Sequence, residues 1–232
     1  MKNILLISFV GVDTHTDLDS LSLISKSSYY NTEWSVLYSD SKSVGNHTRY
    51  PSYQFCNDFL NLNSCDLYCS LHLCGSVIER YLKEEQDVLA LCNKAFRIQL
   101  NLNINNYPDH EKLSNDIESM MSKHGHKIIL QQNKTKEKFM KTFLGKAKTK
   151  ISLLYDGSGG FGRVISKIDP PDDYHITGYA GGINPENVSG IVGLINKNNP
   201  SDLPIYIDME SGVRENNIFS LDKCRQVISN LM

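Results

Sequence analysis

The stretch ITGYAGGINPENVSGIVGLI, residues 176–195, contains the transition that decides the fold. An apolar run at 174–179 meets Gly181-Gly182, and residues 185–196 then carry apolar side chains at helical spacing. A short strand joined to a helix by a tight glycine turn is one βα unit. Glycine permits the positive φ of such a turn, and it also exposes N–H groups that can hold an anion before a helix. Gly181-Gly182 by itself is compatible with a tight structural turn or with an anion site.

The same alternation repeats along the chain of 232 residues. Helical periodicity follows most of the short apolar runs, at 17–30, 52–61, 75–93 with a break near Lys83-Glu84, 110–123, 134–144, 185–196 and 220–231. The runs themselves predict eight strands, at 4–10, 33–38, 68–73, 96–101, 127–131, 151–155, 174–179 and 204–209. Eight such units predict one α/β domain over 1–232, a single (β/α)₈ TIM barrel, with an open doubly wound sheet as the alternative.

The composition is that of an ordinary globular chain, with 40% apolar and 22% charged residues and a net charge of −2. This charge favours neither nucleic acid nor an anionic membrane as a partner. No apolar run reaches the ~18 residues that span a bilayer, and we interpret 4–10 as the first strand rather than a signal peptide. We expect a cytoplasmic protein, a monomer or a homodimer, with the lysine-rich segment 134–150 as a solvated helix face.

Six cysteines are present, and a chain of this length needs no disulfides to build a core. Cys65, Cys69, His72 and Cys74 lie close together and offer a zinc interpretation. They lack a CxxC pair and a second cluster that would complete a tetrahedral site. We therefore expect reduced, mostly buried thiols, no metal and no organic cofactor.

Polar residues gather at the strand ends, where a (β/α)₈ barrel forms its site. A strand covered on both faces should be almost wholly apolar, and a single exception is usually a paired structural group. Five strands with amides or carboxylates at the same end indicate a lined pocket instead. The candidate pocket residues are Glu33, His72, Gln99, Asn101, Gln131, Asp156, Asp208 and Glu210.

Glycines follow the last three strands of the predicted barrel. DGSGGFG occupies 156–162, Gly181-Gly182 follows the seventh strand, and Ser211-Gly212 follows the eighth. In such barrels the last loops are the usual phosphate site, because their main-chain N–H groups approach the anion closely. The candidate phosphate ligands are Gly160, Gly181, Gly182, Ser211 and Gly212.

Three strings, LLYDGSGGFG (153–162), GYAGGINPENV (178–188) and IDMESGV (207–213), resemble phosphoribosylanthranilate isomerases in order and spacing. VGVDTHTDLDSL (10–21) is more distantly similar to the opening of that family. The likeness is good over the last third of the chain and poor over 34–150. It implies a (β/α)₈ barrel and a small-molecule substrate, with a phosphate on that substrate as one option.

The sequence departs from the family at the residues that carry the reaction. The family's catalytic cysteine precedes a glycine, and here Val10, which cannot move a proton, precedes Gly11. The position of its acid holds Tyr155, with Asp156 one place later, and a one-residue shift turns a strand side chain to the other face. Glu210 replaces a serine at the phosphate site, where a carboxylate repels a dianion. We expect a divergent barrel that does not catalyse the tryptophan-pathway step.

The polar set suits an isomerase or lyase that moves protons on a sugar-like or sugar-phosphate molecule. Asp156 is the candidate acid/base with His72 as its partner, and Glu210 is the third catalytic candidate. Glu33, Gln99, Asn101, Gln131 and Asp208 would bind substrate hydroxyls, with Asp208 also a possible second base. The alternatives are a non-catalytic ligand-binding barrel, a true isomerase with a rearranged site, and a divalent cation held by Glu33, His72, Asp156 and Glu210.

Overall fold

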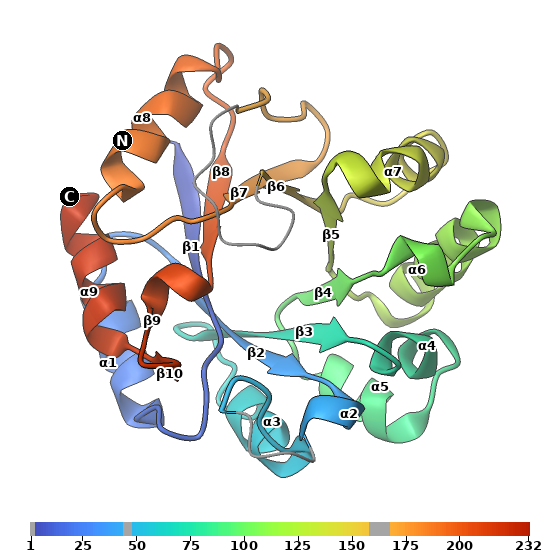
Figure 1. Ribbon diagram of the computed structural model, residues 1–232, viewed down its shortest axis with the longest axis horizontal. Coiled ribbons are helices and arrows are strands. Elements are labelled where there is room, and N and C mark those ends of the chain that lie inside the picture. The colour runs from blue at the N-terminus through green and yellow to red at the C-terminus, as the bar shows by residue number, and fades with distance from the viewer. Residues whose placement is uncertain (1–2, 44–47, 158–167) are drawn as a thin grey trace.

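Eight parallel strands close into a ring at the centre of the molecule, and this confirms the predicted barrel (Figure 1). The computed structural model describes residues 3–43, 48–157 and 168–232. Each strand pairs with the next along the chain, and β8 pairs with β1. The strands are β1 (Ile4–Val10), β2 (Thr32–Tyr38), β3 (Tyr68–Cys74), β4 (Ile98–Asn101), β5 (Ile128–Gln132), β6 (Ser152–Asp156), β7 (Ile176–Ala180) and β8 (Ile205–Met209).

Helices surround the ring in Figure 1 and cover the outward faces of the strands. They are α1 (Leu18–Ser27), α2 (Asp40–Ser43), α3 (Tyr53–Leu60), α4 (Val77–Leu82), α5 (Gln86–Cys92), α6 (His110–His124), α7 (Glu137–Leu144), α8 (Val188–Lys197) and α9 (Leu221–Asn230). The expected break within 75–93 separates α4 from α5, where Glu84 adopts a φ of 58°. Short 3₁₀ turns η1 (Ile104–Asn106), η2 (Lys134–Lys136) and η3 (Ser211–Val213) and a hairpin of β9 (Arg214–Glu215) and β10 (Ile218–Phe219) complete the described chain.

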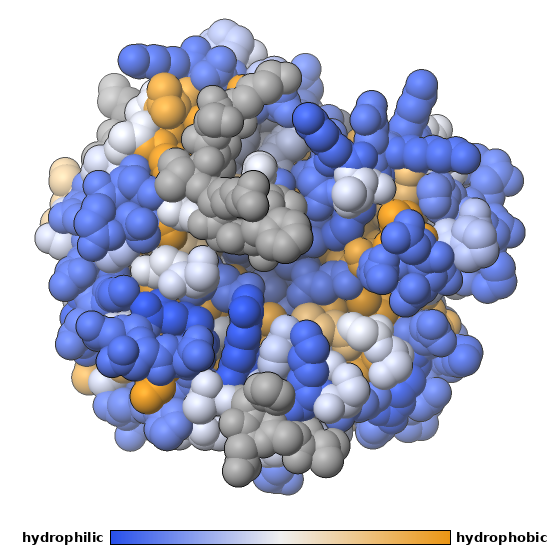
Figure 2. Space-filling view, viewed as in Figure 1, coloured by the Kyte–Doolittle hydropathy of each residue, from blue (hydrophilic) through white to orange (hydrophobic). Residues whose placement is uncertain are grey.

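The main core lies between the ring and the helices. Trp34 from β2 is fully buried there, as are Phe59 from α3 and Phe139 from α7, which the helical spacing of apolar residues turns toward the ring. The face in Figure 2 is largely hydrophilic, with apolar side chains only in small patches. Within the described residues, no helix is long and apolar enough to cross a bilayer.

The inside of the barrel is unusually polar. Because side chains alternate between the two faces of a strand, the pairing of Ser8 with Glu33 and with Asp208 points all three inward. Two small apolar clusters share this interior, one around Leu154 and Tyr206 and the other around Val10. In most barrels bulky aliphatic side chains fill these layers, so the polar interior needs internal partners.

One interior layer is built on a buried ion pair. Arg97, directly before β4, donates from Nε to Glu33 Oε1 at 2.8 Å and from its NH2 group to Glu33 Oε2, and both side chains are at most 5% exposed. Arg97 also donates to Ser152 Oγ at 3.0 Å and lies 4.3 Å from the centre of the Tyr206 ring. Gly178 makes room for that ring, since a Cβ there would lie 2.1 Å from Tyr206 Cζ. The even-numbered strands thus build one layer across the barrel. Its members are Glu33 on β2, Arg97 directly before β4, Ser152 on β6 and Tyr206 on β8.

Arg97 keeps the Glu33 carboxyl ionised. Burial alone would raise the pKa of Glu33, but the charge and hydrogen bonds of Arg97 outweigh it, so this pKa is lowered. Ser70 Oγ also donates to Glu33 Oε1. Glu33 is therefore an ionised carboxylate that depends on Arg97.

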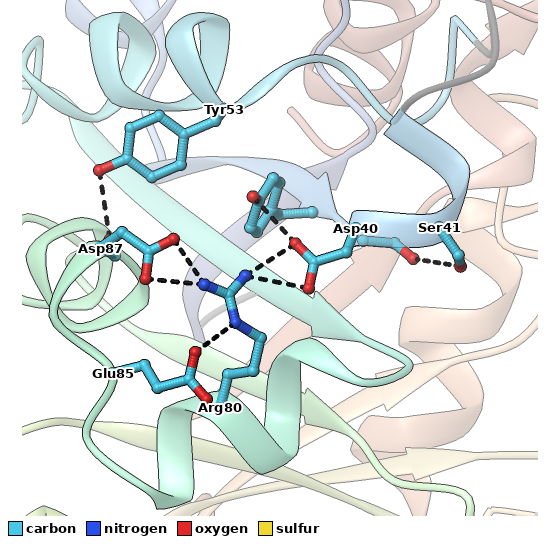
Figure 3. Close-up of polar contacts among 8 residues, drawn as sticks. Asp40, Ser41, Tyr53, Arg80, Glu85 and Asp87 are labelled. Carbon is cyan, nitrogen blue, oxygen red and sulfur yellow. Dashed lines mark hydrogen bonds and ion pairs between the residues drawn. The ribbon is translucent and has the colours of Figure 1, made fainter.

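A second charge cluster fixes α2 next to the end of β2 (Figure 3). Arg80 donates to both oxygens of Asp40 at 3.0 Å, to both of Asp87 at 2.8 and 2.6 Å, and to Glu85 at 2.7 Å. Tyr53 adds a hydrogen bond of 3.2 Å to the Asp87 carbonyl oxygen. Because bidentate guanidinium–carboxylate pairs are geometrically specific, this cluster ties α2 to α4 and α5.

Substitution of Arg97 tests the dependence of the fold on the ion pair. Arg97→Met leaves the Glu33 carboxylate buried without a counter-charge, and we expect the free energy of unfolding to fall by about 3–5 kcal/mol. Arg97→Met combined with Glu33→Leu removes both charges and should recover most of this loss. Urea unfolding followed by circular dichroism measures both values. Equal destabilisation of the single and the double variant would contradict the assignment.

Candidate functional site

A cavity of about 240 Å³ opens at the carboxyl end of the barrel. Residues at the ends of β3 to β8 line it together with Arg49 from the loop before α3. The structure therefore brings most of the predicted set together. The predicted residues that line this cavity are His72, Gln99, Asn101, Gln131, Asp156, Gly181, Gly182, Asp208, Glu210 and Ser211.

The deep part of this cavity contains polar atoms without partners. Among the described residues, no hydrogen-bond partner is found for three buried atoms of residues that line it: His72 Nε2, Gln99 Oε1 and Asp208 Oδ1. An unpartnered buried polar group costs about 1–3 kcal/mol, so three of them in one cavity destabilise the fold considerably. Such a cluster fits a polar ligand whose hydroxyl or carbonyl groups supply the missing partners.

Asp208 is the most perturbed acid of the cavity. It lies on β8 with only 6% of its surface exposed. Burial, with smaller contributions from the carboxylates of Glu33 and Glu210, raises its pKa to about 7, although the Ser8 hydroxyl and Arg97 oppose the shift. A carboxyl group with this pKa exchanges its proton at neutral pH, as a general acid or base must.

His72 lies on β3 and is 2% exposed. Burial lowers its pKa to about 4; the Glu33 carboxylate opposes this shift and Arg97 adds to it. The imidazole is therefore neutral at pH 7, with one ring nitrogen available to donate and the other to accept a hydrogen bond. It can orient a substrate oxygen or relay a proton without carrying a permanent charge.

Amide side chains form one wall of the cavity. Gln99 donates to Asn101 Oδ1 at 2.7 Å, and Asn101 donates in turn to the Cys74 sulfur at 3.1 Å. On β5, Gln131 Oε1 accepts from Lys136 Nζ at 2.6 Å. These hydrogen bonds fix the wall before any ligand arrives.

Lys136 contacts the lining residue Gln131, and sequence reasoning missed this contact. It belongs to the segment expected to be solvated, yet it is only 7% exposed. Burial lowers its pKa to about 8, although the nearby Asp156 carboxylate opposes the shift. Its position in η2, directly after β5, was the available signal, because that end of a barrel carries the site.

Asp156 lines the cavity and Tyr155 does not. Asp156 is the last residue of β6 and pairs with Ala180, in the inward-facing register of Leu154 and Gly178. Tyr155 points outward and its ring stacks on Tyr179 with 5.8 Å between centres. Asp156, and not Tyr155, therefore presents its side chain to the cavity at the end of β6.

The carboxyl ends of β1 and β2 are apolar inside the barrel. Val10, which the sequence resemblance matches to the isomerases' cysteine, is buried in a cluster with Leu37 and Cys74. Burial raises the pKa of the Cys74 thiol to about 11. Val10 and Leu37 offer no group for proton transfer, since valine and leucine carry no titratable side chain.

The glycine turn after β7 adopts the backbone that its sequence predicts. Gly181 and Gly182 have φ of 120° and 60°. Asn184 and Asn187 lock the following loop, because each accepts from the other's main-chain N–H at 2.9 and 3.0 Å and Asn187 donates to the Gly182 carbonyl at 2.8 Å. The turn therefore has a structural reason, and phosphate binding there stays a prediction.

The loop after β8 packs against this turn. Ser211 lines the cavity, and Gly212 lies so close to the turn that a Cβ there would be 1.9 Å from the Ile183 carbonyl oxygen. Arg214 donates to the Gly11 carbonyl at 2.7 Å and to Asp13 at 2.8 Å, which ties this loop to the end of β1. Gly160, the remaining predicted phosphate ligand, lies outside the described residues.

Arg49 neutralises Glu210, which was expected to repel a phosphate. Its Nε and NH2 groups both contact Glu210 Oε1. Thr48 Oγ1 donates to the Asn217 carbonyl at 3.0 Å, which holds the Arg49 segment against the β9–β10 hairpin. Nothing in the sequence places this loop over the cavity, so Arg49 is a second residue that sequence reasoning missed.

Two expectations about the set are wrong. Glu33 is near the start of β2 and pairs with Arg97 below the cavity, so it cannot contact a ligand at the mouth. The four residues proposed to share a divalent cation therefore do not converge. The residues that the structure describes contain no group of three His, Cys, Asp or Glu side chains placed to hold a metal ion.

Comparison with solved structures identifies the architecture. Phosphoribosyl anthranilate isomerase from Thermotoga maritima superposes with a TM-score of 0.63 at 19% identity over 98% of both chains. The enzyme from Pyrococcus furiosus gives 0.60 at 15% identity over 98% of both chains. The chain has the fold of phosphoribosylanthranilate isomerase. No family model and no curated protein sequence matches it.

A third isomerase structure contains a ligand. It was solved with reduced 1-(o-carboxyphenylamino)-1-deoxyribulose 5-phosphate and matches with a TM-score of 0.59 at 17% identity over 98% of both chains. These identities establish a shared fold alone. The chemistry of this isomerase-like barrel therefore follows from its own cavity residues and not from the likeness.

Asp208→Asn tests whether burial of the ionised Asp208 carboxylate lowers the free energy of unfolding. A pKa of about 7 in the folded state, against ~3.9 for an ordinary aspartate, means that the folded protein binds this proton more tightly than the unfolded chain. Stability is therefore lost as pH rises from about 4 to about 7. We expect the variant to exceed the wild type in unfolding free energy by up to about 4 kcal/mol at pH 8, and by less at pH 5.

Urea unfolding at pH 5 and pH 8 measures this difference. Glu33→Gln is the matched control, because the pKa of Glu33 is lowered and its contribution is already complete above pH 5. That variant should lose the same stability at both pH values. A gain for Asp208→Asn that does not grow with pH would contradict the assignment.

Proposed function

We propose that the protein is an isomerase or lyase that moves protons on a small, hydroxyl-rich molecule, with Asp208 as the acid/base group. The observation that carries this proposal is the buried Asp208 carboxyl, which has a pKa near 7 and faces the cavity. A buried carboxylate with a purely structural role would be stabilised by a hydrogen bond to each of its oxygens. The described residues supply no hydrogen bond to Asp208 Oδ1. A substrate hydroxyl or carbonyl oxygen completes the hydrogen bond.

Asp156 and His72 are proposed as the groups that share the proton transfer. Asp156 comes from β6 and Asp208 from β8, so two carboxyl groups approach the cavity from strands on either side of β7. One acid that holds its proton and a second that accepts one is the arrangement that an isomerisation requires. The neutral His72 orients the substrate oxygen between them.

Gln99, Asn101 and Gln131 are proposed to bind substrate hydroxyls. Their amides are fixed by the hydrogen bonds of the wall, so they are pre-organised for a ligand. The Gln99 oxygen still lacks a partner among the described residues. A hydroxyl group donates to such an oxygen at little further cost in conformational entropy.

A phosphate on the substrate would lie at the rim of the cavity. Gly181, Gly182 and Ser211 line that rim and would offer their main-chain N–H groups, with Gly212 packed against Ile183 and Arg49 also in the lining. Arg49 already pairs with Glu210, so we assign Glu210 the role of holding this guanidinium rather than moving a proton. A phosphorylated sugar is therefore the favoured substrate class.

Solvent exchange tests the reaction across a whole class of candidate substrates at once. The protein is incubated in D₂O with a panel of aldose and ketose phosphates and their unphosphorylated parents, and proton NMR follows the loss of hydrogen from the carbon next to the carbonyl. We expect exchange for at least one compound, and a decrease of about a hundredfold or more in Asp208→Asn. Asp156→Asn with unchanged exchange would remove Asp156 from the mechanism.

Arg49→Gln tests the phosphate position. We expect the affinity for a phosphorylated ligand to fall by about tenfold, because one charge-assisted contact is lost, while the unphosphorylated parent binds as before. Isothermal titration calorimetry measures both. A common decrease for the two ligands would show that Arg49 supports the loop rather than the phosphate.

A non-catalytic ligand-binding barrel is the second candidate. The observation that favours it is the burial of Val10 among apolar side chains at the position of the isomerases' cysteine. A compound that raises the melting temperature but never exchanges hydrogen would support this candidate. For the same reason we expect no rescue of tryptophan-independent growth in a strain that lacks phosphoribosylanthranilate isomerase.

A further inference from the structure

A second cavity, of about 260 Å³, lies at the opposite, amino-terminal end of the barrel. Its inner wall is the layer that contains Arg97, Ser152 and Tyr206, and this layer separates it from the cavity at the mouth. Residues at or just before the starts of several strands form its sides, among them Leu6, Tyr68, Phe96 and Ile128. Nothing in the proposed reaction uses this end of the barrel.

The walls of this lower cavity are apolar and aromatic. The rings of Tyr68 and Phe96 are stacked at 4.3 Å between centres with an angle of 16°. Leu5 and Ile176 at its opening remain 44% and 38% exposed. Exposed aliphatic side chains around a cavity are typical of a site where a ligand buries an apolar group.

The charge of the lower cavity is positive. Its lining includes Lys127, Lys150 and Arg97, and among the described lining residues none is acidic. The chain as a whole has more acidic than basic residues, 26 against 24, so composition does not explain this excess. Charge complementarity therefore selects an anionic ligand.

The two lysines are not neutralised by the part of the protein that the structure describes. Lys127 Nζ lies 4.6 Å from the centre of the Phe96 ring, and Lys150 Nζ lies 5.2 Å from that of Tyr174. Neither ammonium group has an ion pair or a side-chain hydrogen bond among the described residues. Arg97, in contrast, is already paired with Glu33. The lysines are the charges that remain for a ligand.

We propose that the lower cavity binds an aromatic carboxylate. The apolar ring of the ligand would lie against Tyr68, Phe96 and Ile176, and its carboxylate would contact the ammonium groups of Lys127 and Lys150 at the opening. Flat aromatic bodies fit walls made of stacked rings, and a single carboxylate matches two lysines that have no other partner among the described residues. The site is independent of the reaction proposed at the mouth.

Binding of 2-naphthoate, with 2-naphthamide as its uncharged isostere, tests this site by equilibrium dialysis. We expect one site for naphthoate on the wild-type protein and weaker binding of naphthamide. Lys127→Gln with Lys150→Gln should weaken naphthoate by about fivefold to tenfold and leave naphthamide unchanged. Lys138→Gln, a matched exposed lysine on α7, should change neither.

Ile176→Trp locates the site. Ile176 is at the start of β7 and lines the lower cavity, so a larger side chain fills the space that the ligand ring would occupy. Naphthoate binding should be lost in this variant, and the melting temperature serves as the check that it folds. No binding to the wild type, equal affinity in the double lysine variant, or wild-type affinity in Ile176→Trp would each overturn the proposal.

Discussion

The ion pair between Glu33 and Arg97 is the interaction on which the rest of the barrel interior depends. It occupies a layer that other barrels fill with aliphatic side chains, and it separates the two cavities. Its two charges act in opposite directions on both His72 and Asp208. Burial is the largest cause of both pKa shifts: it leaves the imidazole neutral and keeps a proton on the carboxyl near neutral pH.

The cavity above this layer combines rigid and unsatisfied groups. Hydrogen bonds fix the amide wall, reciprocal asparagine contacts lock the turn after β7, and Arg214 ties the last loop to the end of β1. Within that frame, buried atoms of Asp208 and His72 have no partner among the described residues. Natural proteins tolerate such a cost in stability mainly where a ligand recovers it.

The comparison with the isomerases separates fold from chemistry. The chain follows their architecture over nearly its whole length at identities of 13–19%. The sequence resemblance implies departures from that family near Val10, Asp156 and Glu210; in the structure the valine is buried, the aspartate faces the cavity and Arg49 neutralises the glutamate. Packing of strands against helices tolerates such changes, whereas proton transfer depends on each titratable group, so the same barrel can carry a different reaction.

The sequence by itself determined the eight strands, the break between α4 and α5, the glycine turn and the gathering of polar residues at one end, because these follow from local periodicity and from the parallel order of the strands. Only the tertiary structure decided that Glu33 lies below the site, that Lys136 is buried and that Arg49 reaches Glu210. The stagger of the strands sets the height of each residue in the barrel, and loops bring in partners from distant positions. The charge of each titratable residue depends on how deeply it is buried and on its distance to other charges. Neither quantity can be read from the local sequence pattern.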